Sequence, residues 1–364
     1  MIPLAQLVPR STQRAERIRV LIVDDSLVIR HLIMEALGAD PAIEIVGAEA
    51  NGALALARIP ELKPHVVTLD IEMPVMNGLE TLRQIRKLHP RLRTIMFSTL
   101  TKRGAGVTLE ALASGADDYV AKAANAGSLD KSLVSLRSDL IPKIKQFFAT
   151  PEPARLPRLE TVNPPASAKS TPHAKAQVVV IGVSTGGPQA LGELIPRLPA
   201  TFALPVVIVQ HMPPMFTRLL AERLDSSSPL KVVEAQEGME LRPGLVLVAR
   251  GDHHLRFRRT GAAVATTLDQ GEPENSCRPS VDVMFRSAAQ VYGASAFAVM
   301  LTGMGSDGLK GTYLLKNAGA RSLVQDRETS VVWGMPGAVA EAGLADQVLP
   351  LNEIPAALVR LSTE

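Results

Sequence analysis

A serine lies in a glycine-rich turn in the second half of the chain, and its setting suits nucleophilic chemistry. The segment 178–187 reads Val-Val-Val-Ile-Gly-Val-Ser-Thr-Gly-Gly, an apolar run followed by small residues. This pattern predicts a buried strand that turns into a helix, with the hydroxyl of Ser184 exposed beside free backbone amides. Gly182-x-Ser184-x-Gly186 matches the motif of a serine-hydrolase nucleophile, although that motif alone is weakly specific.

A serine hydroxyl is a poor nucleophile unless a neighbouring base removes its proton. His211 is the candidate base, because it follows the next apolar run, residues 206–210. Asp307 is the candidate orienting carboxylate and follows the apolar run 296–301. The carboxyl ends of parallel strands open into one crevice, so the three side chains can meet there. The order Ser, His, Asp differs from that of the α/β-hydrolases, but a triad is defined by geometry.

Each of these residues also has a simpler interpretation. The turn could bind a phosphate at a helix N-terminus, although no lysine follows the glycines as in a P-loop. A lone histidine at a strand end is commonly structural, and Asp307 could cap a helix. Three such residues at three strand ends favour catalysis. Cys277 is interpreted as a loop residue without an adjacent base. His253 and His254 fall in a predicted hairpin, where alternation places their rings on opposite faces, so a shared metal site is not expected.

A second polar group lies in the first half of the chain, again at predicted strand ends. Asp24 and Asp25 follow one apolar run, Asp70 ends another, and Ser98 and Lys122 follow two more. Three converging carboxylates need a cation, and oxygen ligands suit Mg²⁺. With Mg²⁺ bound, a carboxylate can attack a phosphoryl group while a lysine offsets the developing charge. Two aspartates after a strand would ordinarily indicate a helix cap, but the full set is more specific.

This set resembles the receiver domain of bacterial two-component response regulators over nearly the whole length of that domain. The resemblance implies a role for each residue: phosphoacceptor (Asp70), Mg²⁺ ligands (Asp24, Asp25 and Asp70), phosphoryl contacts (Ser98 and Lys122) and an aromatic side chain that reorients on activation (Tyr119). One departure is Ala123, because receivers usually carry proline there. A cis peptide bond at that position is therefore not expected.

Periodicity along the chain predicts two α/β domains, in which strands and helices alternate over parallel sheets. We expect an N-terminal tail over 1–17, the receiver over 18–148, a linker with six prolines over 149–176, and a catalytic domain over 177–364. In the last of these, strands are expected at 177–181, 205–210, 245–249, 254–258, 262–267, 296–301 and 322–325. Consecutive strands without helices indicate a β-hairpin insertion in a doubly wound, mainly parallel fold.

Composition limits the possible partners and locations of a chain of 364 residues. A net charge of +3 and 3% aromatic residues argue against a nucleic-acid-binding protein. The single cysteine excludes an intramolecular disulfide bond and suits a reducing compartment. Residues 1–17 lack the apolar core of a secretory signal, and no apolar run reaches the length of a membrane span. The sequence therefore predicts a cytoplasmic protein that is not inserted in a membrane.

The catalytic half carries four motifs: Gly-Val-Ser-Thr-Gly-Gly, Val-Gln-His-Met-Pro-Pro, Cys-Arg-Pro-Ser-Val-Asp-Val-Met-Phe and Leu-Thr-Gly-Met-Gly-Ser-Asp-Gly. Together with the receiver and the linker they resemble the chemotaxis response-regulator methylesterase family, CheB, over about residues 18–362. The resemblance implies a flavodoxin-like receiver and places the family's triad on Ser184, His211 and Asp307. It also places Thr185 and the backbone of Met304 near the oxyanion and the substrate.

The activity that this resemblance implies is hydrolysis of glutamate γ-methyl esters on chemoreceptors, with deamidation of specific receptor glutamines. The implied phosphodonor is the chemotaxis histidine kinase, and the esterase reaction is expected to need no cofactor. The receiver is expected to cover the active site until Asp70 is phosphorylated. Two alternatives remain: a non-catalytic adaptor that binds receptors or the kinase, and a receiver-controlled hydrolase of soluble esters.

Overall fold

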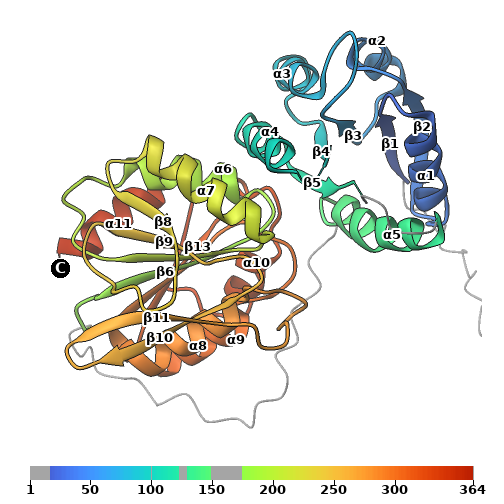
Figure 1. The fold of residues 1–364 in the computed structure, drawn as a ribbon. Helices are drawn as coiled ribbons and strands as arrows, with labels where there is room; N and C mark the ends of the chain where they lie inside the picture. Colours follow the sequence, from blue (N-terminus) through green and yellow to red (C-terminus); the bar gives the residue numbers. More distant parts are fainter. Residues whose placement is uncertain (1–16, 100, 123–128, 149–173, 364) are drawn as a thin grey trace, which may run out of the picture.

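The computed structural model describes residues 17–99, 101–122, 129–148 and 174–363. These residues form two α/β units, drawn in blue to green and in green to red in Figure 1. Ala123, nearly all of the predicted tail and most of the predicted linker lie outside the described residues. The predictions made for those segments therefore stay predictions.

The first unit is a parallel sheet of five strands with helices around it. Its strands are β1 (Ile18–Val23), β2 (Ile43–Glu49), β3 (Val66–Asp70), β4 (Arg93–Ser98) and β5 (Asp118–Ala121). The strand order is β2-β1-β3-β4-β5, which is the flavodoxin-like order. Its helices are α1 (Leu27–Gly38), α2 (Gly52–Leu62), α3 (Gly78–Leu88), α4 (Lys102–Ala113) and α5 (Leu129–Lys145).

The second unit contains a parallel sheet of seven strands, in the order β14-β13-β12-β6-β7-β9-β8. These strands are β6 (Val178–Val183), β7 (Val206–Gln210), β8 (Lys231–Glu234), β9 (Leu245–Val248), β12 (Ala296–Met300), β13 (Arg321–Gln325) and β14 (Gln347–Leu349). The predicted hairpin is present as the antiparallel pair β10 (His254–Thr260) and β11 (Ala263–Asp269). It forms a separate two-stranded sheet.

Helices cover both faces of this second sheet (Figure 1). They are α6 (Gly187–Leu194), α7 (Pro214–Ser227), α8 (Val281–Tyr292), α9 (Leu309–Asn317), α10 (Met335–Glu341) and α11 (Ile354–Thr363). Three short 3₁₀ turns, Ile195–Arg197, Gly293–Ser295 and Leu351–Glu353, adjoin helices or strands.

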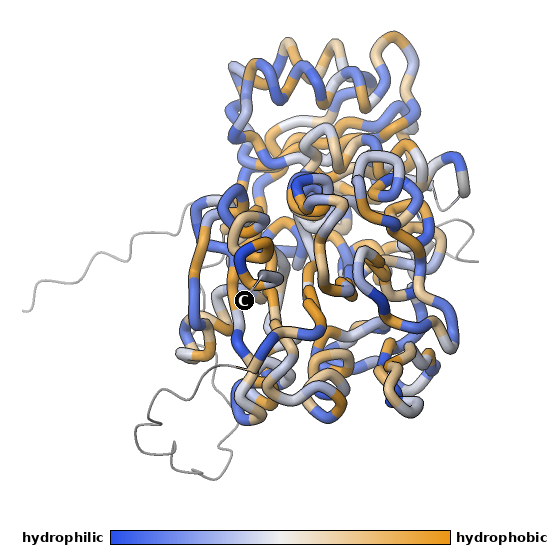
Figure 2. The backbone as a smooth tube through the Cα atoms, turned by 90° about the vertical axis from the view of Figure 1, so that its left-hand side faces the viewer, coloured by the Kyte–Doolittle hydropathy of each residue, from blue (hydrophilic) through white to orange (hydrophobic). Residues whose placement is uncertain are grey.

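Strand β6 is buried on both faces, which explains why its sequence is apolar throughout. Val179, Ile181 and Val183 pack into the hydrophobic cluster that includes side chains of α6, α7 and α11. Val178 and Val180 point to the opposite face and join the cluster formed with α8, α9 and α10. Successive side chains of a strand alternate between faces, so a strand buried on both sides reads as one continuous apolar run. Figure 2 shows such apolar stretches inside the molecule.

Strand order also determines where functional residues can gather. Strands β7, β9 and β8 extend the sheet on one side of β6. Strand β12, which comes later in the chain, pairs with the other side of β6. The crevice at the carboxyl ends of β6 and β12 is therefore a topological switch point, where open α/β sheets bind their ligands. The same reversal occurs between β1 and β3 of the first unit.

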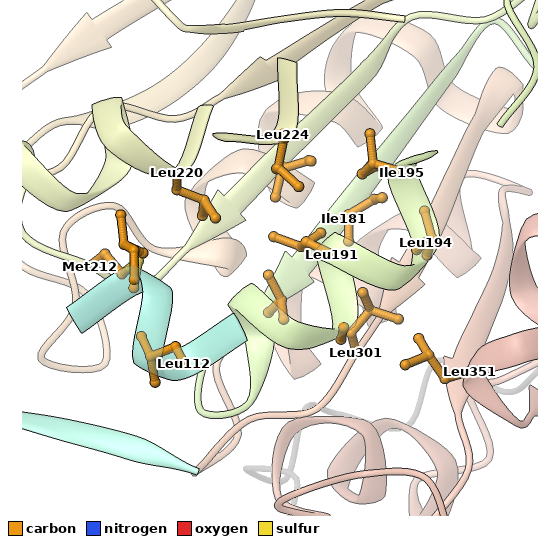
Figure 3. Close-up of a cluster of buried hydrophobic side chains, with 14 of the residues drawn as sticks. Leu112, Ile181, Leu191, Leu194, Ile195, Met212, Leu220, Leu224, Leu301 and Leu351 are labelled. Atoms are coloured by element: carbon orange, nitrogen blue, oxygen red, sulfur yellow. The ribbon is translucent and has the colours of Figure 1, made fainter. Parts of the chain in front are cut away.

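The two units share a hydrophobic interface. Helix α4 packs against α6 and α7, and Leu112 of α4 belongs to the same buried cluster as Leu191, Met212 and Leu220 of the second unit (Figure 3). The ring of Tyr119, on β5, stacks on Phe216 of α7 with 4.8 Å between ring centroids. Burial of such apolar surface stabilises a docked arrangement of the units.

Candidate active site and receiver site

Ser184 lies directly after β6, in a tight turn that leads into α6. The amide of Gly187 donates to the carbonyl of Ser184 at 2.8 Å, and Gly186 has φ +78° and ψ −2°. This is a type II turn, which requires positive φ at its third residue and therefore favours glycine there. Among the described residues, Ser184 is not one with positive φ, so the turn differs from the strained elbow of the α/β-hydrolases. The motif predicted the position of the serine but not this backbone.

Three glycines around Ser184 are required by close contacts. A β-carbon on Gly182 would lie 2.5 Å from the side chain of Val281, and one on Gly186 would lie 2.6 Å from Val331. A β-carbon on Gly303 would lie 2.8 Å from that of Ser184. The loop after β12 therefore packs directly on the serine.

Two side chains that were given no role from the sequence hold this turn. Gln210 donates from Nε2 to the carbonyl of Ser184 at 2.9 Å. Thr302 donates from Oγ1 to the carbonyl of Thr185 at 2.9 Å. Both residues are buried at strand ends, which is the signal that could have identified them. Met304 follows Gly303 in the loop that packs on Ser184, and its side chain is exposed.

His211 directly follows β7, and it forms a close pair with Asp307, which lies in the loop between β12 and α9. Nε2 of His211 lies 2.8 Å from Oδ2 of Asp307, which is 3% exposed. Asp307 also accepts hydrogen bonds from the backbone amides of Val281, Asp282 and Gly308 and from the hydroxyl of Ser280. These donors include the first amides of α8, where the helix dipole favours a negative charge. Burial acts to raise the pKa of Asp307, but His211 and the amide donors outweigh it and lower this pKa.

Cys277 corrects one prediction, because it does have an adjacent base. Its Sγ lies 3.6 Å from Nδ1 of His211, so that both ring nitrogens have a side-chain partner. The contact joins residues 66 positions apart and depends on the loop before α8, which periodicity does not resolve. His254, in contrast, is a buried structural residue: Nε2 contacts the carbonyl of Glu272, and Nδ1 accepts from the amide of Ser280.

The surroundings of His211 favour its charged form. Burial acts to lower the pKa of His211, but Asp307 and Cys277 outweigh burial and raise the pKa to about 9. Ser184 and His211 line the same small cavity. Within the described part of the chain, no hydrogen bond joins the two side chains.

The first unit covers this site. The hydroxyl of Thr185 donates to Oδ2 of Asp118, on β5, at 3.0 Å. Asp118 is 5% exposed and also accepts from Lys143 Nζ at 2.8 Å and from Gln146 Nε2 at 3.2 Å. The sequence pointed to Thr185 but not to Asp118, because the bond crosses between units whose docking no local pattern reveals.

Little space remains between the docked units at the serine. The cavity there has about 60 Å³ and is lined by Ser184, Thr185 and His211 from one unit and by Asp118 and Tyr119 from the other. Sites for small molecules typically offer at least ~300 Å³. The docked first unit therefore narrows the space beside Ser184.

The carboxylates predicted to bind Mg²⁺ lie together at the switch point of the first sheet. Asp24, Asp25 and Asp70 each place a carboxylate oxygen within 4.8 Å of the others. This donor set, with room for water, fits an Mg²⁺ ion. Nζ of Lys122 lies 2.9 Å from Asp24 and 2.8 Å from Asp70. Burial raises the pKa of Asp70 to about 6 despite Lys122, which leaves the carboxylate mostly ionised at neutral pH.

Ser98 and Tyr119 are the other two predicted switch residues, and their contacts are with residues other than Asp70. The Ser98 hydroxyl accepts from Thr108 Oγ1 and donates to backbone carbonyls, one of them that of Gly104. Thr99, next to it, lines the pocket over Asp70 together with Lys122. Tyr119 points to the second unit and stacks on Phe216, so the residue expected to reorient is itself an interface contact.

Comparisons with known proteins agree with this architecture. A family model described as CheB methylesterase matches residues 179–358, and one described as response regulator receiver domain matches 20–134. A protein of Nocardioides sp. named protein-glutamate methylesterase/protein-glutamine glutaminase is 51% identical over 95% of this chain and 96% of its own length. A protein of the same name from Thermotoga maritima is 43% identical over 94% of this chain and 98% of its own.

A solved structure supports the fold of the second unit. The crystal structure of the Thermotoga maritima CheB methylesterase catalytic domain is 48% identical to this chain, with a TM-score of 0.51. It covers 51% of this chain and 99% of that one. Across the described residues, no helix is both long and apolar enough to span a membrane. The chain belongs to the CheB methylesterase family, with a response-regulator receiver domain ahead of its catalytic domain.

Proposed function

We propose that this chain hydrolyses glutamate γ-methyl esters on chemoreceptors, deamidates receptor glutamines, and is activated by phosphorylation of its receiver. The observation that carries the proposal is the His211–Asp307 pair, 2.8 Å apart, at the strand ends beside Ser184. The names of the relatives support the same activity and favour it over a non-catalytic adaptor. The domain bounds 18–148 and 177–364 and the cytoplasmic location are part of this proposal.

Ser184 is the proposed nucleophile and His211 its base. Nε2 of His211 pairs with Asp307, so Nδ1, which Cys277 contacts at 3.6 Å in this structure, is the nitrogen that would take the serine proton. The serine oxygen adds to the ester carbonyl, and His211 then gives the proton to the departing methanol, or to ammonia when the substrate is glutamine. Water, deprotonated by the same nitrogen, releases the glutamate and restores Ser184.

The negative oxygen of the tetrahedral intermediate needs donors that are already in place. Backbone amides of the turn after Ser184 are candidates, with Thr185 and the backbone of Met304. Removal of one such donor typically costs ~3 kcal/mol of transition-state stabilisation. The raised pKa of His211 suits a base that must hold a proton beside this anion, although it also implies that the docked enzyme carries mostly imidazolium at pH 7.

Asp70 is the proposed phosphoacceptor, with Asp24 and Asp25 as further ligands of Mg²⁺. When bound, Mg²⁺ would neutralise charge on the incoming phosphoryl group. Lys122, already 2.8 Å from Asp70, would contact a phosphoryl oxygen, and Ser98 would turn toward another. The chemotaxis histidine kinase is the proposed donor.

Regulation would act through β5, which connects the receiver site with the interface. Lys122 follows β5, and its backbone amide donates to the carbonyl of Ser98. Asp118 and Tyr119, on the same strand, hold Thr185 and Phe216 of the catalytic domain. A phosphoryl group that engages Lys122 would displace this short strand and weaken both contacts.

Release of methanol from methylated receptor membranes tests the proposed activity. The wild-type chain with Mg²⁺ and a small acyl phosphate should release methanol, and Ser184→Ala should not. Equal release by the two proteins would eliminate the esterase and favour an adaptor. A soluble ester that competes poorly with receptor membranes would argue against the hydrolase of soluble esters.

A further inference from the structure

The turn that carries Cys277 to His211 has an unusual backbone. The amides and carbonyls of Glu274 and Cys277 bond to each other at 3.1 and 3.0 Å. Between them, Asn275 and Ser276 have φ of +54° and +61°. Positive φ at both central residues is typical of a type I′ turn, which favours asparagine at its first position and disfavours serine at its second. Non-glycine residues held in this region suggest a functional constraint.

The side chain of Asn275 joins two buried carboxylates. Its Nδ2 donates to Oδ1 of Asp307 at 2.6 Å and to Oδ2 of Asp282 at 2.9 Å. Asp282 and Asp307 are 1% and 3% exposed, and the other oxygen of Asp282 accepts from the amide of Gly311. Burial, and then the charge of Asp307, raise the pKa of Asp282. An amide with two N–H donors is suited to hold two carboxylates that otherwise repel each other.

The same turn reaches the opposite edge of the imidazole. Glu274 is fixed to α8 by two bonds to Arg286, at 3.0 and 2.8 Å. Three residues later, Cys277 Sγ lies 3.6 Å from His211 Nδ1. One short turn therefore contacts His211 from both sides, at Nε2 through Asp307 and at Nδ1 through Cys277.

We propose that Asn275 is a positioning residue for the His211–Asp307 pair, because its amide orients Asp307 while its backbone turn places Cys277 against His211. This inference rests on the proposed function, since it assigns the turn a role in that reaction. The competing explanation is that Asn275 only satisfies the backbone of a turn that connects β11 to α8.

Two substitutions separate these explanations in the full chain, activated with Mg²⁺ and a small acyl phosphate. Asn275→Gly keeps the positive φ but removes the amide, and Ser276→Gly changes the neighbouring residue of the same turn. If Asn275 positions Asp307, Asn275→Gly lowers kcat for methanol release about tenfold, the usual scale of a hydrogen bond to a charged group. Ser276→Gly should keep the wild-type kcat. Equal kcat in the two glycine variants would overturn the proposal.

A pH profile gives a second readout, of the contact between Asn275 and Asp307. Asn275→Asp keeps the shape but adds a carboxylate beside Asp307, so the pKa of His211 rises and the kcat/KM profile moves to higher pH. The ionisable groups around the pair include those of the turn, of α8 and α9, and of the receiver side of the cavity: Glu274, Cys277, Asp282, Arg286, Lys310, Asp117, Asp118, Tyr119 and Lys143. An unchanged profile would contradict the proposal even if Asn275→Gly failed to fold. Methanol release that survives in Ser184→Ala would instead refute the proposed function itself.

Discussion

Asp118 offers a way to open the catalytic site without phosphorylation. Its carboxylate accepts the Thr185 hydroxyl across the interface at 3.0 Å, and this is a charged hydrogen bond between largely buried groups. Such bonds contribute a net ~1.5–3 kcal/mol. Because a factor of ten in an equilibrium corresponds to ~1.4 kcal/mol, Asp118→Ala should shift the docked-to-open ratio by about tenfold to a hundredfold.

The basal rate of methanol release should rise by the same factor, up to the rate of the fully open enzyme. The assay is the initial rate from methylated receptor membranes without phosphodonor, in an Asp70→Asn background that excludes phosphorylation. Asp139→Ala is the matched control, because it removes an exposed carboxylate from the same domain and should leave the rate unchanged. A basal rate in Asp118→Ala equal to that of the control would refute the role of this bond in docking.

Three further outcomes are expected. His211 must be neutral to act as base, and its pKa is raised to about 9, so basal methanol release should increase as pH rises from 7 to 9. A rate independent of pH would count against His211 as the base. Cys277→Ala removes a partner that raises this pKa, so the same profile should move to lower pH, and no movement would contradict the Cys277–His211 contact. Gly186→Ala should lower the free energy of unfolding by about 2 kcal/mol or more, since it combines positive φ with a contact at 2.6 Å. Gly238 has φ +74° but open space around it, so Gly238→Ala should lower the free energy of unfolding less than Gly186→Ala does. Thermal denaturation compares the two variants, and equal losses of stability would contradict the role of the contact.

The sequence predicted much of the architecture because strands buried on both faces leave an unmistakable apolar run. The runs of β1, β3, β6 and β7 and the polar residues that follow them placed both sites at strand ends. Two short strands at the edges of the catalytic sheet were not predicted, β8 and β14. Edge strands are partly exposed and need no continuous apolar run, so their sequences carry little signal.

Prolines weaken the helical pattern of three helices: α2, α5 and α11. Each contains a proline, respectively Pro60, Pro142 and Pro355, which ordinarily indicates the end of a helix. In α11 the proline is at the second helical position, where its missing amide donor costs nothing.

The structure brings the candidate residues of the catalytic site near one another, but their contacts could not be predicted from the sequence. Ser184, His211 and Asp307 come from strand ends that the topology brings together, so their spacing was sufficient. Cys277 and Asp118 could not be found in this way. The first depends on a turn with two residues of positive φ, and the second on an interface between domains whose sequences carry no local sign of it.

The account depends on a serine nucleophile that the receiver covers. Covalent labelling tests this most directly: the full chain is treated with a small alkyl phosphonate ester that reacts with activated serines, and the modified residue and its rate are read by mass spectrometry. We expect the label on Ser184, and faster labelling after Mg²⁺ and an acyl phosphate are added. Labelling of another residue, or a rate that phosphorylation leaves unchanged, would contradict the account.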